Sequence, residues 1–180
     1  MKWGKNCEKG FMCFVAFLIG SQLLMGSPGI AAGADNRIIP ASAEGSVSAS
    51  APDFELRDLN GSMFRLSKYK GDRYVLLYFW ATWCPYCVAV KPQIAKLRET
   101  IALDRMEILA IDVGGGDTLE KLKRYQEGHP AAWPVLYDGD GVATKVYQIQ
   151  GIPLFVLVDK DGNVAYRGNA LPQDLGKFMK

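Results

Sequence analysis

Two cysteines separated by two residues, Cys84 and Cys87, have the spacing in this sequence that most directly predicts chemistry. Such a CxxC pair can form a disulfide and exchange it with another protein through a mixed-disulfide intermediate. The thiolate is the reactive form, and the N-terminal end of a helix lowers the pKa of a cysteine placed there. Pro85 suits the first turn of such a helix. We therefore expect Cys84 to be the attacking cysteine and Cys87 the resolving one.

The segment around this pair predicts a strand, a short connection and a helix. Residues 74–80 (YVLLYFW) form an uncharged run that fits a strand buried on both faces, and residues 81–83 connect it to the cysteines. The helical pattern has apolar positions three and four residues apart: Cys87, Val90, Ile94, Leu97 and Ile101. Cys87 is therefore predicted to be shielded on the apolar face. Cys84, one turn earlier, is predicted to be exposed at the helix N-terminus.

Zinc binding and a purely structural disulfide are the competing explanations of the CxxC pair. A zinc site needs two further ligands, and the chain offers only His129, Cys7 and Cys13. A lone histidine lacks the companion groups of a site, so we predict that His129 is a solvated loop residue. A structural disulfide that closes so short a loop gains little chain entropy. These arguments favour redox chemistry and no metal site.

The first 34 residues have the three parts of a secretory signal. Lysines precede an apolar run, and small residues end at Ala34, after which we expect cleavage. The alternative is an uncleaved segment that anchors the protein in the inner membrane. Residues 35–51, rich in Ala, Ser and Gly, predict a flexible linker to a domain over residues 52–180. The protein is thus predicted to be bacterial and periplasmic, or otherwise extracytoplasmic.

The charge and the cysteine content of the chain exclude some classes of partner and of disulfide. Three of the 21 basic and one of the 19 acidic residues lie in the leader, which leaves 18 of each in a formally neutral domain. A neutral domain argues against a nucleic-acid partner. Cleavage would also remove Cys7 and Cys13, and an exported protein with one remaining cysteine pair has no disulfide framework that would account for that pair.

The rest of the chain alternates predicted strands and helices. A turn at Asn60-Gly61 predicts an N-terminal hairpin. The expected elements are a hairpin over 54–56 and 63–66, strands at 106–113, 133–137, 154–158 and 164–167, a helix capped by Asp117 with Glu120, and helices over 142–147 and from about Pro172. Gly114 to Gly116 is followed by no Gly-Lys-Ser/Thr, so a flexible turn is favoured over a phosphate loop.

Three motifs together resemble the exported TlpA/ResA/CcmG-like thiol–disulfide oxidoreductases of the thioredoxin fold. They are WATWCPYC at 80–87, Gly-Ile-Pro at 151–153 before a strand, and APDF at 51–54, and the resemblance covers about residues 51–180. It implies an α/β thioredoxin fold, with a four-stranded central mixed β-sheet flanked by helices and an N-terminal β-hairpin extension.

The resemblance also implies roles for residues around the cysteines. Pro153 would be a cis-proline facing the disulfide, and Ile152 would offer its backbone to an extended substrate. Trp83, Pro85 and Tyr86 would support the cysteines and contact substrate. Two family carboxylates are missing, because Tyr78 stands where thioredoxin has an aspartate and Val90 where ResA-like members have a glutamate. Another group must then handle the proton of the resolving cysteine.

We expect the protein to exchange thiols and disulfides with other proteins and to reduce the disulfides of its substrates. No cofactor is expected other than the redox-active Cys84–Cys87 disulfide. The resemblance implies apocytochrome c as one substrate, as in cytochrome c maturation, and a membrane thiol transporter as electron donor; we expect a monomer. The alternatives are a periplasmic dithiol oxidase and, from another class, a metallochaperone or a non-catalytic binding module of the same fold. Peroxidase chemistry is disfavoured because no Thr-x-x-Cys motif is present.

Overall fold

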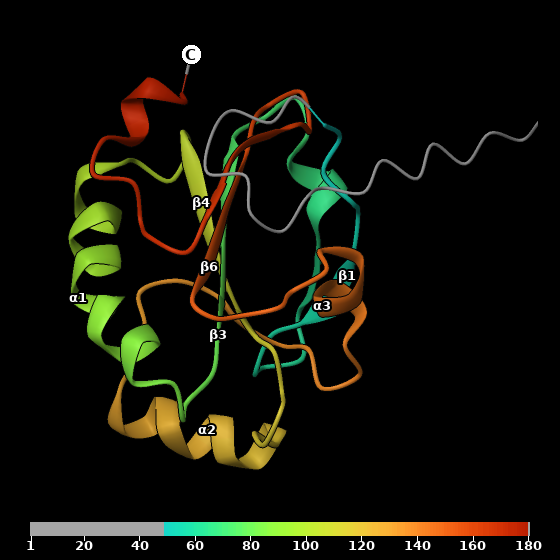
Figure 1. Ribbon diagram of the computed structural model, residues 1–180, viewed down its shortest axis with the longest axis vertical. Helices are drawn as coiled ribbons and strands as arrows, with labels where there is room; N and C mark the ends of the chain where they lie inside the picture. Colours follow the sequence, from blue (N-terminus) through green and yellow to red (C-terminus); the bar gives the residue numbers. More distant parts are fainter. Residues whose placement is uncertain (1–48, 180) are drawn as a thin grey trace, which may run out of the picture. The chain divides into compact units, whose positions relative to one another are not determined.

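A seven-residue strand, β3 (Tyr74–Trp80), lies at the centre of the fold (Figure 1). The computed structural model describes residues 49–179. Every residue of β3 is buried, as the uncharged run predicted. β3 is the middle strand of a five-stranded sheet with the order β5-β4-β3-β6-β7, whose other members are β4 (Met106–Asp112), β5 (Val135–Tyr137), β6 (Leu154–Val158) and β7 (Val164–Gly168).

The sheet is mixed in direction. β4 runs parallel to β3 and β5 parallel to β4, whereas β6 is antiparallel to β3 and β7 antiparallel to β6. The parallel β3–β4 pair requires a crossover, and α1 (Pro85–Thr100) supplies it. The strand–helix–strand order predicted around the CxxC motif is therefore confirmed.

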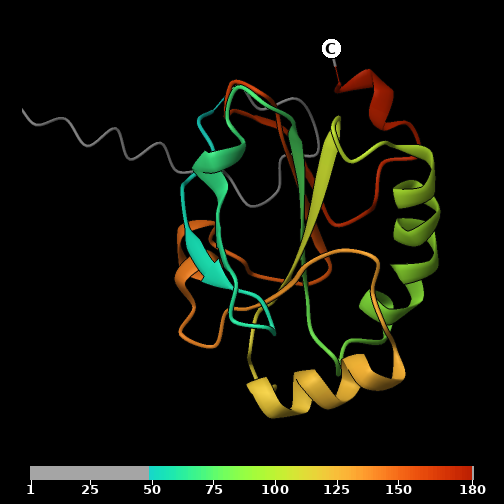
Figure 2. The same ribbon diagram turned by 180° about the vertical axis from the view of Figure 1, so that it is seen from behind.

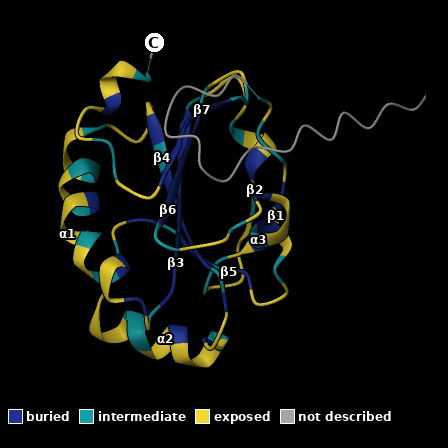
Figure 3. Ribbon diagram, viewed as in Figure 1, coloured by how far each residue is buried: buried dark blue, intermediate teal, exposed yellow. Residues whose placement is uncertain are grey.

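Alternate side chains of β3 enter two different cores, because successive residues of a strand point to opposite faces. One core holds Leu76, Tyr78, Trp80 and both cysteines, and the other holds Val75, Leu77 and Phe79. Residues of α1 and α2 (Leu119–Gly128) complete the first core (Figures 1 and 2). Residues of α3 (Val142–Val146) and of the hairpin β1 (Glu55–Arg57) and β2 (Met63–Arg65) complete the second. The sheet is buried and the outer faces of α1 and α2 are exposed (Figure 3).

The N-terminal hairpin is confirmed as a two-stranded antiparallel sheet, in which Leu56 lies opposite Phe64. A 3₁₀ turn, η1 (Leu66–Tyr69), follows it and leads to β3. Backbone pairing includes Ala51, whose N–H donates to the carbonyl of Gly162 at 2.9 Å. The predicted signal over residues 1–34, and the linker as far as residue 48, lie outside the described residues. Within residues 49–179, no helix is long and apolar enough to cross a membrane.

Four details of the predicted elements are wrong. The sheet has five strands rather than four, since β5 pairs with β4. β5 begins at Val135 rather than residue 133, because Pro134 has no N–H to donate. Helix α2 is capped by the Thr118 hydroxyl, which accepts from the N–H of Lys121, and not by Asp117. The C-terminal helix is only a 3₁₀ turn, η2 (Leu175–Lys177), because so short a segment containing a glycine cannot offset helix nucleation.

Candidate active site

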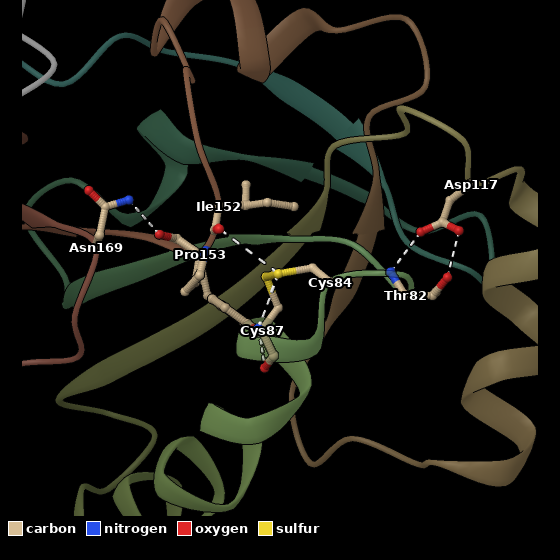
Figure 4. The surroundings of a disulfide bond; sticks show 8 residues. Thr82, Cys84, Cys87, Asp117, Ile152, Pro153 and Asn169 are labelled. Atoms are coloured by element: carbon tan, nitrogen blue, oxygen red, sulfur yellow. Dashed lines mark hydrogen bonds between the residues drawn. A yellow bond between two sulfur atoms is a disulfide. The ribbon is translucent and has the colours of Figure 1, made fainter.

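A disulfide joins Cys84 and Cys87 where β3 ends and α1 begins (Figure 4). Their Cα atoms are 5.2 Å apart, within the usual range for a disulfide. Cys84 is also the N-cap of α1, because its Sγ accepts a hydrogen bond from the Cys87 N–H at 3.2 Å. The sulfur therefore faces the positive end of the helix dipole, which favours a thiolate at Cys84 once the disulfide is reduced.

The burial of the two cysteines differs in part from the prediction. Cys87 is fully buried, as the helical pattern indicated, but Cys84 is only 4% exposed. The segment around Ile152 covers it, with the Cys84 Sγ 3.9 Å from the Ile152 carbonyl oxygen. The residues beside the cysteines are open instead, since Trp83 is 51% and Tyr86 78% exposed. A substrate thus meets a mostly aromatic rim before it reaches the sulfur.

The loop opposite the disulfide contains a cis peptide bond between Ile152 and Pro153, as predicted. The backbone carbonyl of Ile152 in this loop points toward Cys84 (Figure 4). The side-chain amide of Asn169 donates to the Pro153 carbonyl at 2.7 Å. This bond ties the loop to the end of β7, so Asn169 helps to hold the wall of the site. Sequence reasoning missed Asn169, which follows the last strand and matches no motif.

The connection between β3 and the cysteines is fixed by Asp117. One Asp117 carboxylate oxygen accepts from the Thr82 N–H at 2.7 Å and the other from the Thr82 hydroxyl at 2.6 Å (Figure 4). Lys121 forms an ion pair with the same carboxylate at 2.6 Å. Burial acts to raise the pKa of Asp117, but the hydrogen bonds from Lys121 and Thr82 outweigh it and hold that pKa below its usual value. Asp117 therefore positions the active-site connection instead of capping α2.

Two of the three glycines predicted as a flexible turn, Gly115 and Gly116, lie against the side chain of Trp83, whereas Gly114 faces the backbone of Gly139. Gly114, Gly115 and Gly116 all have positive φ, and Gly116 has φ +108°. A Cβ atom added at Gly116 would lie 3.6 Å from the Trp83 indole nitrogen. Glycine is needed because other residues rarely adopt this backbone conformation. The loop thus sets the position of the aromatic side chain beside Cys84.

Replacing Gly116 with alanine is expected to disturb both stability and substrate contact. The strained φ should cost about 1–2 kcal/mol of unfolding free energy. The backbone of the loop should shift to relieve this strain, and Trp83, which packs on the loop at ordinary contact distance, should shift with it. Gly61→Ala is the matched control, since Gly61 also has a positive φ (+87°) but open space around it. Denaturant unfolding should therefore show a loss in both variants, whereas a raised KM for disulfide reduction should appear only in Gly116→Ala. An equal KM in the two variants would contradict the role of the loop in positioning Trp83.

No carboxylate lies at the two positions where the resemblance implied one. Tyr78 is fully buried, and its hydroxyl donates to the Cys87 carbonyl at 2.7 Å. Burial raises the pKa of Tyr78 far above neutrality, so it orders the first turn of α1 but does not accept a proton. The first core does contain a buried carboxyl, Asp112 at the end of β4, whose pKa burial raises to about 8. Sequence reasoning missed Asp112, although an acidic residue that ends an apolar strand is a visible signal.

His129 is not part of a group of possible metal ligands among the described residues. It is exposed at the end of α2, where its ring stacks on Tyr125 with centroids 4.3 Å apart and its Nδ1 is 3.0 Å from the Tyr125 carbonyl. Across residues 49–179 there is no group of three or more histidine, cysteine or acidic side chains that could hold a metal ion. The exposed position agrees with the prediction of a solvated loop residue.

The mixed sheet, the CxxC disulfide at the start of α1 and the facing cis-proline define a thioredoxin-fold thiol–disulfide oxidoreductase. Residues 47–167 match the AhpC/TSA family, and the chain belongs to that family.

The similar proteins of known name or structure include thiol–disulfide oxidoreductases and a thioredoxin. The thiol-disulfide oxidoreductase ResA of Geobacillus kaustophilus is 34% identical over 136 residues, which cover 74% of this chain and 76% of that protein. ResA of Bacillus thuringiensis is 31% identical, with 72% and 75% covered. Among solved structures, an exposed lipoprotein thioredoxin of Streptococcus pneumoniae has a TM-score of 0.61 at 29% identity and covers 68% of this chain and 92% of its own. A DsbE thiol:disulfide interchange protein of Chlorobium tepidum has a TM-score of 0.62 at 25% identity, with 73% and 88% covered.

Proposed function

We propose that this protein is an extracytoplasmic reductant of protein disulfides, with Cys84 as nucleophile and Cys87 as resolving cysteine. The observation that carries the proposal is the position of the Cys84 sulfur. It caps α1, faces the Cys87 N–H and lies beside the cis-proline loop. Cys87 has no exposed surface, whereas Cys84 keeps 4% of its surface exposed and lies between the exposed residues Trp83 and Tyr86, so a partner disulfide can reach Cys84 first. This difference in access supports the assignment of the two roles.

The exchange proceeds in two balanced steps. The Cys84 thiolate attacks one sulfur of the substrate disulfide, which forms a mixed disulfide and releases the first substrate thiolate. Cys87 then loses its proton and attacks the Cys84 Sγ, which closes the protein disulfide and releases the second substrate thiolate. The protein is oxidised by two electrons and the substrate reduced by two. The cysteine pair itself carries these electrons, and no further cofactor is required.

Substrate binding falls to the surface around Cys84. Trp83 and Tyr86 present exposed aromatic area, Pro85 shapes the first turn, and Ile152 offers backbone groups to an extended chain. We propose a polypeptide disulfide as substrate, with CxxCH cysteines of apocytochrome c as one candidate, because this chain resembles relatives named ResA, at 34% identity, and DsbE, at 25% identity. A membrane thiol transporter is the proposed electron donor, and we propose that the protein acts as a monomer.

An extracytoplasmic location is supported by two observations. Residues 1–34 have the composition of a secretory signal, and one structural neighbour is an exposed lipoprotein. We propose export to the periplasm or another extracytoplasmic compartment. The leader is then either cleaved after Ala34 or kept as an anchor in the inner membrane. Such a compartment is oxidising, so a reductant there needs a continuous supply of electrons.

The reduction potential of the Cys84–Cys87 pair in the full chain tests the direction of electron flow. We expect a value near that of thioredoxin, about −270 mV, measured by equilibration with glutathione or dithiothreitol buffers. The Pro85-Tyr86 dipeptide supports this, since it lacks the histidine that strong oxidants carry between their cysteines. A value near about −120 mV would mean that the disulfide is the unstable form and that the protein is a dithiol oxidase.

A further inference from the structure

The side chain of Lys91 on α1 is partly exposed, but its Nζ atom is buried. Its Nζ has no accessible surface and no acceptor among the described residues. Two aromatic rings enclose it instead, with the Nζ 3.8 Å from the centroid of Trp80 and 4.4 Å from that of Tyr125. Burying a cation is costly unless it is compensated, and cation–π contacts compensate only in part. A leucine or methionine would fill this space without that cost, so the charge calls for a functional explanation.

Lys91 lies on the same helix as Cys87, one turn further along α1. It follows Cys87 by four residues on α1, so the two side chains lie on one face of the helix. Helical side chains lean toward the helix N-terminus, which directs the stem of Lys91 over the turn that contains Cys87. Trp80, whose ring lies under the Nζ, belongs to the same buried cluster as both cysteines. The Lys91 Nζ and both cysteines are shielded from bulk solvent, so their electrostatic interaction is less screened than it would be at the surface.

The other ionisable groups of this cluster do not cancel the charge at neutral pH. They include Asp112 on β4, Tyr125 on α2 and Tyr78 on β3. Burial raises the pKa of Asp112 to about 8 and raises those of Tyr125 and Tyr78, so all three are predominantly protonated and uncharged at pH 7. Burial lowers the pKa of Lys91 to about 8, although Asp112 opposes this shift, so the lysine is still mainly a cation. A net positive charge therefore remains beside the cysteines.

We propose that Lys91 is a positioning residue that stabilises the thiolates of the reduced Cys84–Cys87 pair through its charge. This inference rests on the proposed function. Reduction breaks the S–S bond and adds two electrons, which leaves a thiolate at Cys84 and, after uptake of one proton, a thiol at Cys87. The Lys91 ammonium favours the Cys84 thiolate for attack. In the resolving step it favours loss of the Cys87 proton to water before Cys87 attacks the Cys84 Sγ. Lys91 forms no bond to sulfur at any stage.

The test compares Lys91→Met with Lys91→Arg and with Lys96→Met, an exposed control on the same helix. The readout is the pH dependence of iodoacetamide alkylation of the reduced full chain. In Lys91→Met the pKa of the attacking thiol should rise by about one unit, and alkylation near pH 6 should slow about tenfold. The equilibrium with glutathione should shift about tenfold toward the disulfide, which is about 30 mV. Lys91→Arg should keep the wild-type profile, since it keeps the charge, and Lys96→Met should not change it.

Two outcomes would overturn the proposal. One is a Lys91→Met protein that folds and has the wild-type alkylation profile; the other is a Lys91→Arg protein that shifts as far as Lys91→Met, since packing would then explain the effect. Alkylation needs no partner disulfide, so it reports on Lys91 even if the protein reduces none of the substrates tried. Failure of the proposed function would instead appear as an absence of disulfide exchange in the wild-type protein.

Discussion

Replacing Cys84 with serine is expected to abolish disulfide reduction by the full chain. Serine keeps the size of the side chain and can accept the same hydrogen bond from the Cys87 N–H, so α1 should remain capped. A neutral hydroxyl is a far weaker nucleophile than a thiolate, and the rate of insulin-disulfide reduction should fall on the order of 10³-fold or more. Cys7→Ser and Cys13→Ser are the matched controls and should keep full activity.

Replacing Cys87 with serine should stop the reaction one step later. Cys84 can still attack, but no thiol is left to resolve the product, so a mixed disulfide should accumulate. Non-reducing electrophoresis and mass spectrometry would detect it and identify the substrate. Trapping by Cys84→Ser but not by Cys87→Ser would show that the roles of the two cysteines are reversed. Unchanged insulin reduction in Cys84→Ser would contradict the hypothesis that the protein is an enzyme. Binding of copper that requires Cys84 would instead favour a metallochaperone.

The centre of the fold could be predicted because its signals are local. The apolar run of β3, the helical spacing after Cys84 and the proline in the first turn each specify one element. Their order then requires a crossover and a parallel neighbour. The cis bond before Pro153 could be expected only because the resemblance placed a proline opposite the disulfide. Physical patterning and resemblance thus contributed to different parts of the prediction.

The errors arise where the deciding contact joins distant parts of the chain. The segment around Ile152, 68 residues later in the chain, covers Cys84, and no local sequence pattern around Cys84 predicts this contact. Asp117 resembles a helix cap in sequence, but its carboxylate is occupied by Thr82, 35 residues earlier. Lys91 falls on a helix where a charged residue normally indicates the exposed side, but rings from β3 and α2 enclose its ammonium group. Tertiary contacts therefore override local preference at several of the residues that shape the site.

The buried carboxyl of Asp112 is expected to make stability fall as the pH rises. Burial raises its folded-state pKa from 3.8 to about 8. Between these values the unfolded chain has released the proton while the folded chain retains it, so stability is present in full below about pH 4 and is lost as pH rises through the folded pKa. The shift corresponds to about 6 kcal/mol as an upper limit, and relaxation around the ionised group should reduce this to on the order of 3 kcal/mol.

Replacing Asp112 with asparagine should remove most of this dependence. Asparagine stays neutral, and its side-chain oxygen can still accept from the Gly114 N–H, as Asp112 does at 2.9 Å. Denaturant unfolding should find the variant close to wild type at pH 4 and more stable by about 3 kcal/mol at pH 8. Asp140→Asn, at an exposed position, should follow the wild-type curve. Parallel curves for Asp112→Asn and wild type would mean that Asp112 is already ionised in the folded protein. The Lys91 charge would then be neutralised, and the expected effect of Lys91 on the cysteine pair would shrink with it.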